Sequence, residues 1–273
     1  MLCTKCGLRP IESTVGRCAR CAALYPSPPD GLMAAAPAPP AEGFHLLRSP
    51  VGLARAAVAL LGAVIATDVL ALIAGLKLRG EYAGIGDTAV YDAGSAGRAE
   101  SLYGAAGTLQ GFALLATAVV FVIWFRRVRL NAEVFDAGLQ PMRPGWAIGA
   151  WFVPVANLWL PRRIAAGIWT ASAQTHPDGS WRTVSKAPLN LWWTLWIVST
   201  LFAWVASKNY EQAELSPGLA DSVTLIMAAD ALDIAAAALA IVFVRKLTRM
   251  QGERAALVMK PFPAPGPAGP ASV

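Results

Sequence analysis

The chain has four cysteines, all within its first 21 residues, as two Cys-x-x-Cys pairs separated by eleven residues. Each pair places two thiolates along one edge of a tetrahedron, and two pairs complete the four-sulfur shell that suits structural Zn²⁺. A segment this small has almost no apolar core, so we expect metal binding and folding to be one event. The sequence predicts a zinc ribbon over residues 1–25, with one structural Zn²⁺ held by Cys3, Cys6, Cys18 and Cys21.

Two disulfides or a redox-active pair are the alternatives for these cysteines. No secretory signal precedes them, and no thioredoxin-like βαβ pattern surrounds them. Basic residues adjoin the cysteines at Lys5, Arg17 and Arg20 and would offset the negative charge of four thiolates. The pattern therefore favours zinc.

Three acidic residues interrupt otherwise apolar runs, where an ionised side chain costs roughly 2.5–3.5 kcal/mol on insertion scales. Asp68 lies near the middle of one run, and Asp230 and Asp233 lie near the middle of another, about 60° apart on a helix. No Lys or Arg lies comparably deep in these runs, so we expect neutral carboxyls or hydrogen bonds to neighbouring polar groups. The candidate partners are Thr67, Gln110, Thr194 and Asn190. Adhesion between helices is the favoured role, and a proton or cation site is the alternative.

A fifteen-residue apolar stretch from Trp146 to Leu160 contains a proline and an amide, Pro154 and Asn157. Pro154 removes a helix hydrogen bond and leaves backbone carbonyls that need partners inside protein or water. The Asn157 amide is one candidate partner, which makes Asn157 the fourth residue of a candidate intramembrane polar site with the three acids. We expect residues 146–173 to form a re-entrant or interfacial segment. It would act as a packing wedge or, alternatively, line a pore, substrate or lipid site.

The composition of the chain identifies the elements that must position these residues. Of 273 residues, 56% are apolar and 15% are charged, with a mean hydropathy of +0.48, whereas soluble domains carry about 25% charged residues. Four apolar runs are each close to the roughly 20 residues that cross a bilayer as a helix. We therefore predict an all-α membrane protein with four transmembrane helices and the proline-broken segment, preceded by the zinc ribbon. The predicted spans are residues 56–76, 102–125, 189–206 and 222–244.

The spans belong to a predicted helical membrane domain over residues 48–250. Residues 26–47 form a Pro/Ala-rich linker between this domain and the ribbon, and residues 251–273 form a Pro-rich tail that we expect to be disordered. The second span contains a GxxxG motif at Gly107 and Gly111. Such a motif predicts close helix packing, within the chain or between copies in a homo-oligomer.

The distribution of basic residues predicts the orientation of the spans. Six Lys and Arg precede the first span, eight lie between the second and third, and five follow the fourth, whereas the other two loops hold four. Basic residues accumulate on the cytoplasmic side, so both termini and the zinc ribbon are expected there. A fifth crossing by residues 146–173 would place the basic stretch from Arg245 to Arg249 outside, against this rule.

The motifs of common enzymes are missing from the sequence. We find no Ser-His-Asp set, no HExxH, no phosphate-binding glycine loop and no dinucleotide fingerprint. The basic ribbon lacks the set of aromatic residues on which RNA-binding modules stack bases, so a nucleic-acid partner is not expected. We predict that the protein is not an enzyme.

Several motifs in the middle of the chain, between Phe125 and Pro161, resemble those of one family. They are Phe125-Arg-Arg-Val-Arg-Leu-Asn-Ala132, Gly145-Trp146, Trp151-Phe-Val-Pro154 and Asn157-Leu-Trp-Leu-Pro161. In this order they resemble the bacterial integral-membrane proteins of domain-of-unknown-function family 4328, over roughly residues 51–249. That family is common in actinobacteria and is often preceded by a zinc-ribbon knuckle. The resemblance implies a multi-pass protein of the bacterial inner membrane and implies no activity, ligand or catalytic residue.

The function predicted from the sequence is non-enzymatic. We expect a membrane scaffold or regulatory protein that displays a cytoplasmic zinc ribbon, which docks an as yet unidentified cytoplasmic protein, with the lipid bilayer as its other partner. The alternative is a small transporter or ion-conducting protein that uses the intramembrane aspartates. A lipid-handling enzyme at the inner face is a third, weaker hypothesis.

Overall fold

The computed structural model describes residues 47–84, 93–140, 142–173, 184–213 and 216–258. The predicted zinc ribbon with its four cysteines lies outside the described residues, as does nearly all of the predicted linker. The described part belongs to one compact unit that begins at residue 46. Its elements are all helical, as the sequence predicts.

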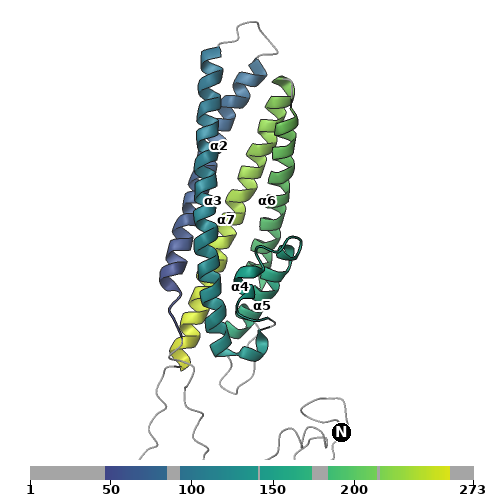
Figure 1. Ribbon diagram of the computed structural model, residues 1–273. Coiled ribbons are helices and arrows are strands. Elements are labelled where there is room, and N and C mark those ends of the chain that lie inside the picture. Colours follow the sequence, from purple (N-terminus) through teal and green to yellow (C-terminus); the bar gives the residue numbers. More distant parts are fainter. Residues whose placement is uncertain (1–46, 85–92, 141, 174–183, 214–215, 259–273) are drawn as a thin grey trace, which may run out of the picture. The chain divides into compact units, whose positions relative to one another are not determined.

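Four long helices dominate the described residues (Figure 1): α2 (Val51–Gly84), α3 (Ala93–Phe135), α6 (Ala187–Gln212) and α7 (Ser216–Val258). Each is long and apolar enough to cross a membrane, which confirms the prediction of a multi-pass membrane protein. All four are longer than the predicted spans. At 1.5 Å per residue the 43 residues of α3 extend about 65 Å, roughly twice the thickness of the hydrocarbon core. Helix α3 therefore continues beyond the hydrocarbon core.

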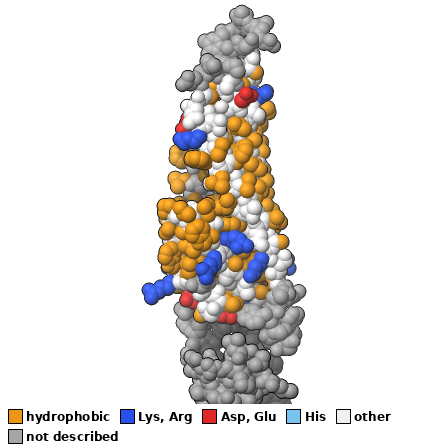
Figure 2. All heavy atoms as spheres, turned by 90° about the vertical axis from the view of Figure 1, so that its right-hand side faces the viewer, with side chains coloured by type: hydrophobic (Ala, Val, Ile, Leu, Met, Phe, Trp, Pro, Cys, Tyr) orange, Lys and Arg blue, Asp and Glu red, His pale blue; other side chains and the backbone are white. Residues whose placement is uncertain are grey.

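Charged and apolar side chains separate along the helices. On the α6 side, a band of hydrophobic side chains lies between charged groups, with several Lys and Arg gathered below it (Figure 2). Large apolar side chains such as Leu115 and Leu201 are 64% and 54% exposed within this part of the protein. Exposure of this extent suits lipid rather than water as the surrounding solvent.

The order of packing is α3, α2, α7, α6. Helix α2 packs along both α3 and α7, and α7 packs along α6. A Cβ placed on Gly75 of α2 would lie 2.9 Å from Cγ of Met227, so glycine permits this close approach of α2 and α7. The GxxxG motif behaves differently: Cβ atoms at Gly107 and Gly111 would meet nothing within 4 Å in the described part. The GxxxG motif therefore does not mediate close helix packing within the described part, although its sequence matches the pattern that predicts such packing.

The proline-broken segment folds into short elements between α3 and α6. These are η2 (Ala137–Leu139), α4 (Trp146–Gly149), η3 (Ala156–Leu158) and α5 (Leu160–Ser172), and both α4 and α5 pack against α3. Proline at position 161 occupies the first turn of α5, where it costs no hydrogen bond. The face of α5 with Ile164, Ile168 and Trp169 is buried in the protein core, whereas Arg162 and Arg163 are exposed.

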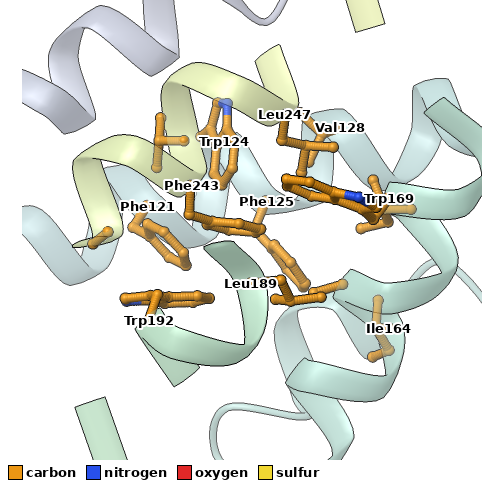
Figure 3. Packing of buried hydrophobic residues seen from close by; sticks show 14 of the residues in the cluster. Phe121, Trp124, Phe125, Val128, Ile164, Trp169, Leu189, Trp192, Phe243 and Leu247 are labelled. Atoms are coloured by element: carbon orange, nitrogen blue, oxygen red, sulfur yellow. The ribbon is translucent and has the colours of Figure 1, made fainter. Parts of the chain in front are cut away.

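Aromatic side chains make up much of the core at this end of the helices (Figure 3). The ring of Phe243 on α7 stacks on Trp192 of α6 at 4.5 Å between centroids and on Trp169 of α5 at 6.0 Å. Its edge meets the ring of Trp124 on α3. One aromatic residue thus connects three other helices, and Trp124, Trp169 and Phe243 are fully buried.

Helix α7 continues to Val258, eight residues past the position where we predicted a disordered tail. Gln251 is 2% exposed and donates hydrogen bonds to the Val128 carbonyl and to the Ser172 hydroxyl. Arg254 donates to the carbonyl of Ala173. These contacts with α3 and with the end of α5 stabilise two further turns of helix.

Candidate functional site

Two of the three intramembrane acids share one amide donor. Nε2 of Gln110 on α3 lies 2.9 Å from Oδ1 of Asp68 on α2 and 3.0 Å from Oδ1 of Asp230 on α7. Asp68 is 1% exposed and Asp230 is 9% exposed, and the second carboxyl oxygen of each has no hydrogen-bond partner among the described residues. A primary amide has two N–H donors, so one glutamine can join two carboxyl groups.

Asp233 belongs to the same cluster. It is half-buried, and the hydroxyl of Ser199 on α6 lies next to its carboxyl group. It lies three residues from Asp230 on α7, within one helical turn. None of the ion pairs formed by the described residues includes any of these acids. The cluster therefore collects three carboxyl groups without a compensating base.

The cluster lies deep within the spans. Lys77 is nine residues beyond Asp68 on α2, and Arg126 is sixteen residues beyond Gln110 on α3. At 1.5 Å per residue these separations are about 14 Å and about 24 Å. The nearest basic residues in these directions are thus too far away to pair directly with the acids.

The residues predicted to be partners of the acids make different contacts. Gln110 takes the predicted role, whereas Thr67 donates to carbonyls of its own helix and Asn190 accepts from Arg162. Thr194 is exposed on α6. Asn157 lies on η3, which packs against α5, and it is not among the groups that contact the acids. The structure therefore brings together Asp68, Asp230 and Asp233 but not Asn157.

A groove of about 610 Å³ runs between α3 and α6. Residues of α2 and α7 form its floor, and Trp151 and Phe152, which follow α4, also line it. Its walls are apolar and aromatic except for Thr117 and Asp233. The groove arises because α3 and α6 pack on opposite sides of the α2–α7 pair and α4 and α5 fill only part of the space between them.

A strained turn at Val155 lies between α4 and η3. Val155 has φ 63° and ψ −50°, and the amide of Ala156 donates to the carbonyl of Pro154 at 2.6 Å. These angles describe a γ-turn that is rare for any residue and particularly unfavourable for a β-branched one. Pro154 therefore ends the helical stretch after α4 and redirects the chain into η3.

Sequence reasoning missed a second polar cluster, near the C-terminal end of α3. The side chain of Asn131 donates to the Arg48 carbonyl and to Oε1 of Gln251, and accepts from the Arg48 amide. Arg129 is 1% exposed and donates to Glu133 and to the carbonyl of Met142. The four-residue spacing of Arg129 and Glu133 was the sequence signal for this ion pair. The adjacent Arg126 and Arg127 made Arg129 resemble an ordinary cytoplasmic charge.

All four cysteines lie outside the described residues. Among the residues that the structure describes, no group of three or more His, Cys, Asp or Glu side chains is arranged to hold a metal ion. The three aspartates thus lie near one another without forming a set of metal ligands.

One comparison with known proteins produced a match. A family model described as "Domain of unknown function (DUF4328)" matches residues 87–249, which is more than half of the chain. The match covers α3 to most of α7 and includes Gln110, Asp230 and Asp233, whereas Asp68 and α2 lie before it. No match was found among curated proteins or among solved structures.

Proposed function

We propose that this chain, which belongs to the DUF4328 family, is a non-enzymatic scaffold or regulatory protein of the bacterial inner membrane. In this proposal a zinc ribbon at residues 1–25 extends on a proline-rich linker into the cytoplasm and docks a protein partner there. The observation that carries the proposal is the pairing of two Cys-x-x-Cys motifs with a multi-pass helical domain. A small metal-stabilised module on a linker is suited to recognition, because it is rigid when loaded and free to reach its partner.

The distribution of charge supports a cytoplasmic ribbon. Arg126, Arg127 and Arg129 lie near the end of α3, and Arg245 and Lys246 lie towards the end of α7, so these two ends are basic. The N-terminal segment that leads into α2 reaches the same end, since the backbone of Arg48 is bonded to Asn131. The positive-inside rule then assigns this end, and the ribbon before it, to the cytoplasm.

The docking role can be tested on the full chain in its own host membrane. Purified protein should contain one Zn²⁺ per chain, and Cys3→Ser with Cys18→Ser should remove the metal while the membrane domain stays folded. A crosslinking residue in the ribbon should trap a defined cytoplasmic protein in the parent chain and not in the cysteine variant. Zinc-free preparations of the parent chain, or crosslinks that are the same in the variant, would contradict the proposal.

A second candidate, a small transporter or ion-conducting protein, is favoured by one observation: Asp68 and Asp230 share Gln110 at the centre of the helices. Proteoliposomes that contain the full chain should then show proton or cation flux. Flux should persist in Asp230→Glu and disappear when Asp230 and Asp233 are both changed to Leu. Absence of flux in the parent chain at several membrane potentials would exclude this candidate.

A further inference from the structure

The groove between α3 and α6 combines an apolar body with one acidic group. Asp233 is the only ionisable residue among the described residues that line it. Asp233 lies one helical turn from Ala236 and Ala237, which form part of the floor. A volume of about 610 Å³ is within the roughly 300–1,000 Å³ of small-molecule sites.

Aromatic rings form much of the wall that faces Asp233. Trp196 and Trp192 on α6 line the groove, and Ser199, beside the Asp233 carboxyl, lies one turn beyond Trp196. Trp151 meets Trp196 edge to face at 5.9 Å between centroids. The negative face of an indole ring attracts cations, and the attraction is strongest where water is excluded.

The groove is accessible from the side rather than from the ends of the helices. Phe152, Leu115 and Val119 line it and are 74%, 64% and 53% exposed. Since these side chains belong to the surface that faces lipid, a ligand would enter from the bilayer. Such a ligand must itself be apolar over most of its surface.

The acidic groups of the cluster favour a positively charged ligand. Asp233 lies one turn from Asp230 on α7, Gln110 joins Asp230 to Asp68, and no ion pair of the described residues supplies a base to any of the three acids. An inorganic cation would need several oxygen ligands, which the apolar and aromatic walls do not offer. An organic cation with an apolar body would find a carboxylate, aromatic faces and apolar walls together.

We propose that the groove between α3 and α6 is a binding site for a lipophilic organic cation, with Asp233 as its counter-ion and Trp196 as its aromatic contact. The site is independent of the docking function proposed for the zinc ribbon. It concerns a different part of the chain and needs neither zinc nor a protein partner.

The test uses the purified full chain in detergent and in nanodiscs, with tetraphenylphosphonium as the cation. Calorimetric titration should show saturable binding at one site per chain. Asp233→Asn should weaken binding at least tenfold, whereas Asp221→Asn, which removes the same charge from an exposed position on α7, should change it less than twofold. Trp196→Leu should weaken binding several-fold, and Trp204→Leu, on the exposed face of the same helix, should not.

Three outcomes would overturn the proposal. The first is the absence of saturable binding by the parent chain. The second is equal weakening by Asp233→Asn and Asp221→Asn. The third is that the neutral analogue triphenylphosphine oxide binds as tightly as the cation and is insensitive to Asp233→Asn, which would identify the groove as a site for lipid acyl chains. If Asp233→Asn proves unfolded by size-exclusion chromatography, the Trp196→Leu and Trp204→Leu pair decides the same question.

Discussion

The side-chain amide of Gln110 on α3 donates a 2.9 Å hydrogen bond to Asp68 on α2, across 42 positions of sequence. The same nitrogen reaches Asp230 on α7, although α3 and α7 share few direct contacts. Gln110 is thus a polar link between helices that otherwise meet mainly through α2. In a membrane interior, where the hydrophobic effect does not drive helices together, such a link contributes directly to assembly.

Gln110→Leu should destabilise the protein by about 1–2 kcal/mol, since interhelical hydrogen bonds in membranes contribute roughly 0.6 kcal/mol each and up to about 1.7 kcal/mol. The change leaves two buried carboxyl groups without their shared donor. Unfolding in mixed detergent micelles measures the loss. The control is Thr108→Leu on the same helix, where the exposed hydroxyl bonds only to its own helix at the Gly104 carbonyl. Equal stability of the two variants would show that the bridge does not contribute to assembly.

Arg129→Met should also destabilise the protein, by about 1.5–3 kcal/mol, the usual range for hydrogen bonds made by charged groups. Methionine fills similar space but leaves the Met142 carbonyl and the Glu133 carboxylate without the guanidinium. Thermal unfolding of the detergent-solubilised chain measures the effect. Arg126→Met, three residues earlier at an exposed position, removes the same charge and should change stability by less than about 0.5 kcal/mol. A larger effect at position 126 would contradict the assignment.

The orientation of the helices predicts which positions a membrane-impermeant thiol reagent can reach. In a variant that lacks the native cysteines, single cysteines at Gly94 and Glu214 should react on intact cells. Cysteines at Gly179 and Gly252 should react only after the membrane is opened, because basic residues gather at that end. Labelling of position 252 on intact cells would show that residues 146–173 contribute a fifth crossing.

The apolar runs of the sequence determined the existence and type of the four long helices. Hydrocarbon thickness sets a minimum length for a spanning helix, and unpaired backbone groups are too costly in lipid to permit irregular alternatives. The motifs from Phe125 to Pro161 likewise sufficed for the family, since the family model covers them. The zinc ribbon and the orientation stay predictions, because the four cysteines lie outside the described residues and the sidedness of the helices rests on the positive-inside rule.

Only the tertiary structure decided how these helices face one another. The sequence placed Asp68, Asp230 and Gln110 in three apolar runs, but their meeting depends on the rotation and axial shift of three helices, which are set by packing. The same holds for α7, which continues past residue 250 because Gln251 finds partners on α3 and α5. Apolar periodicity locates a helix, but an amide or a glycine acquires its role only from the neighbour that packing places opposite it. Gly75 therefore mediates a close approach, and the GxxxG motif on α3 does not.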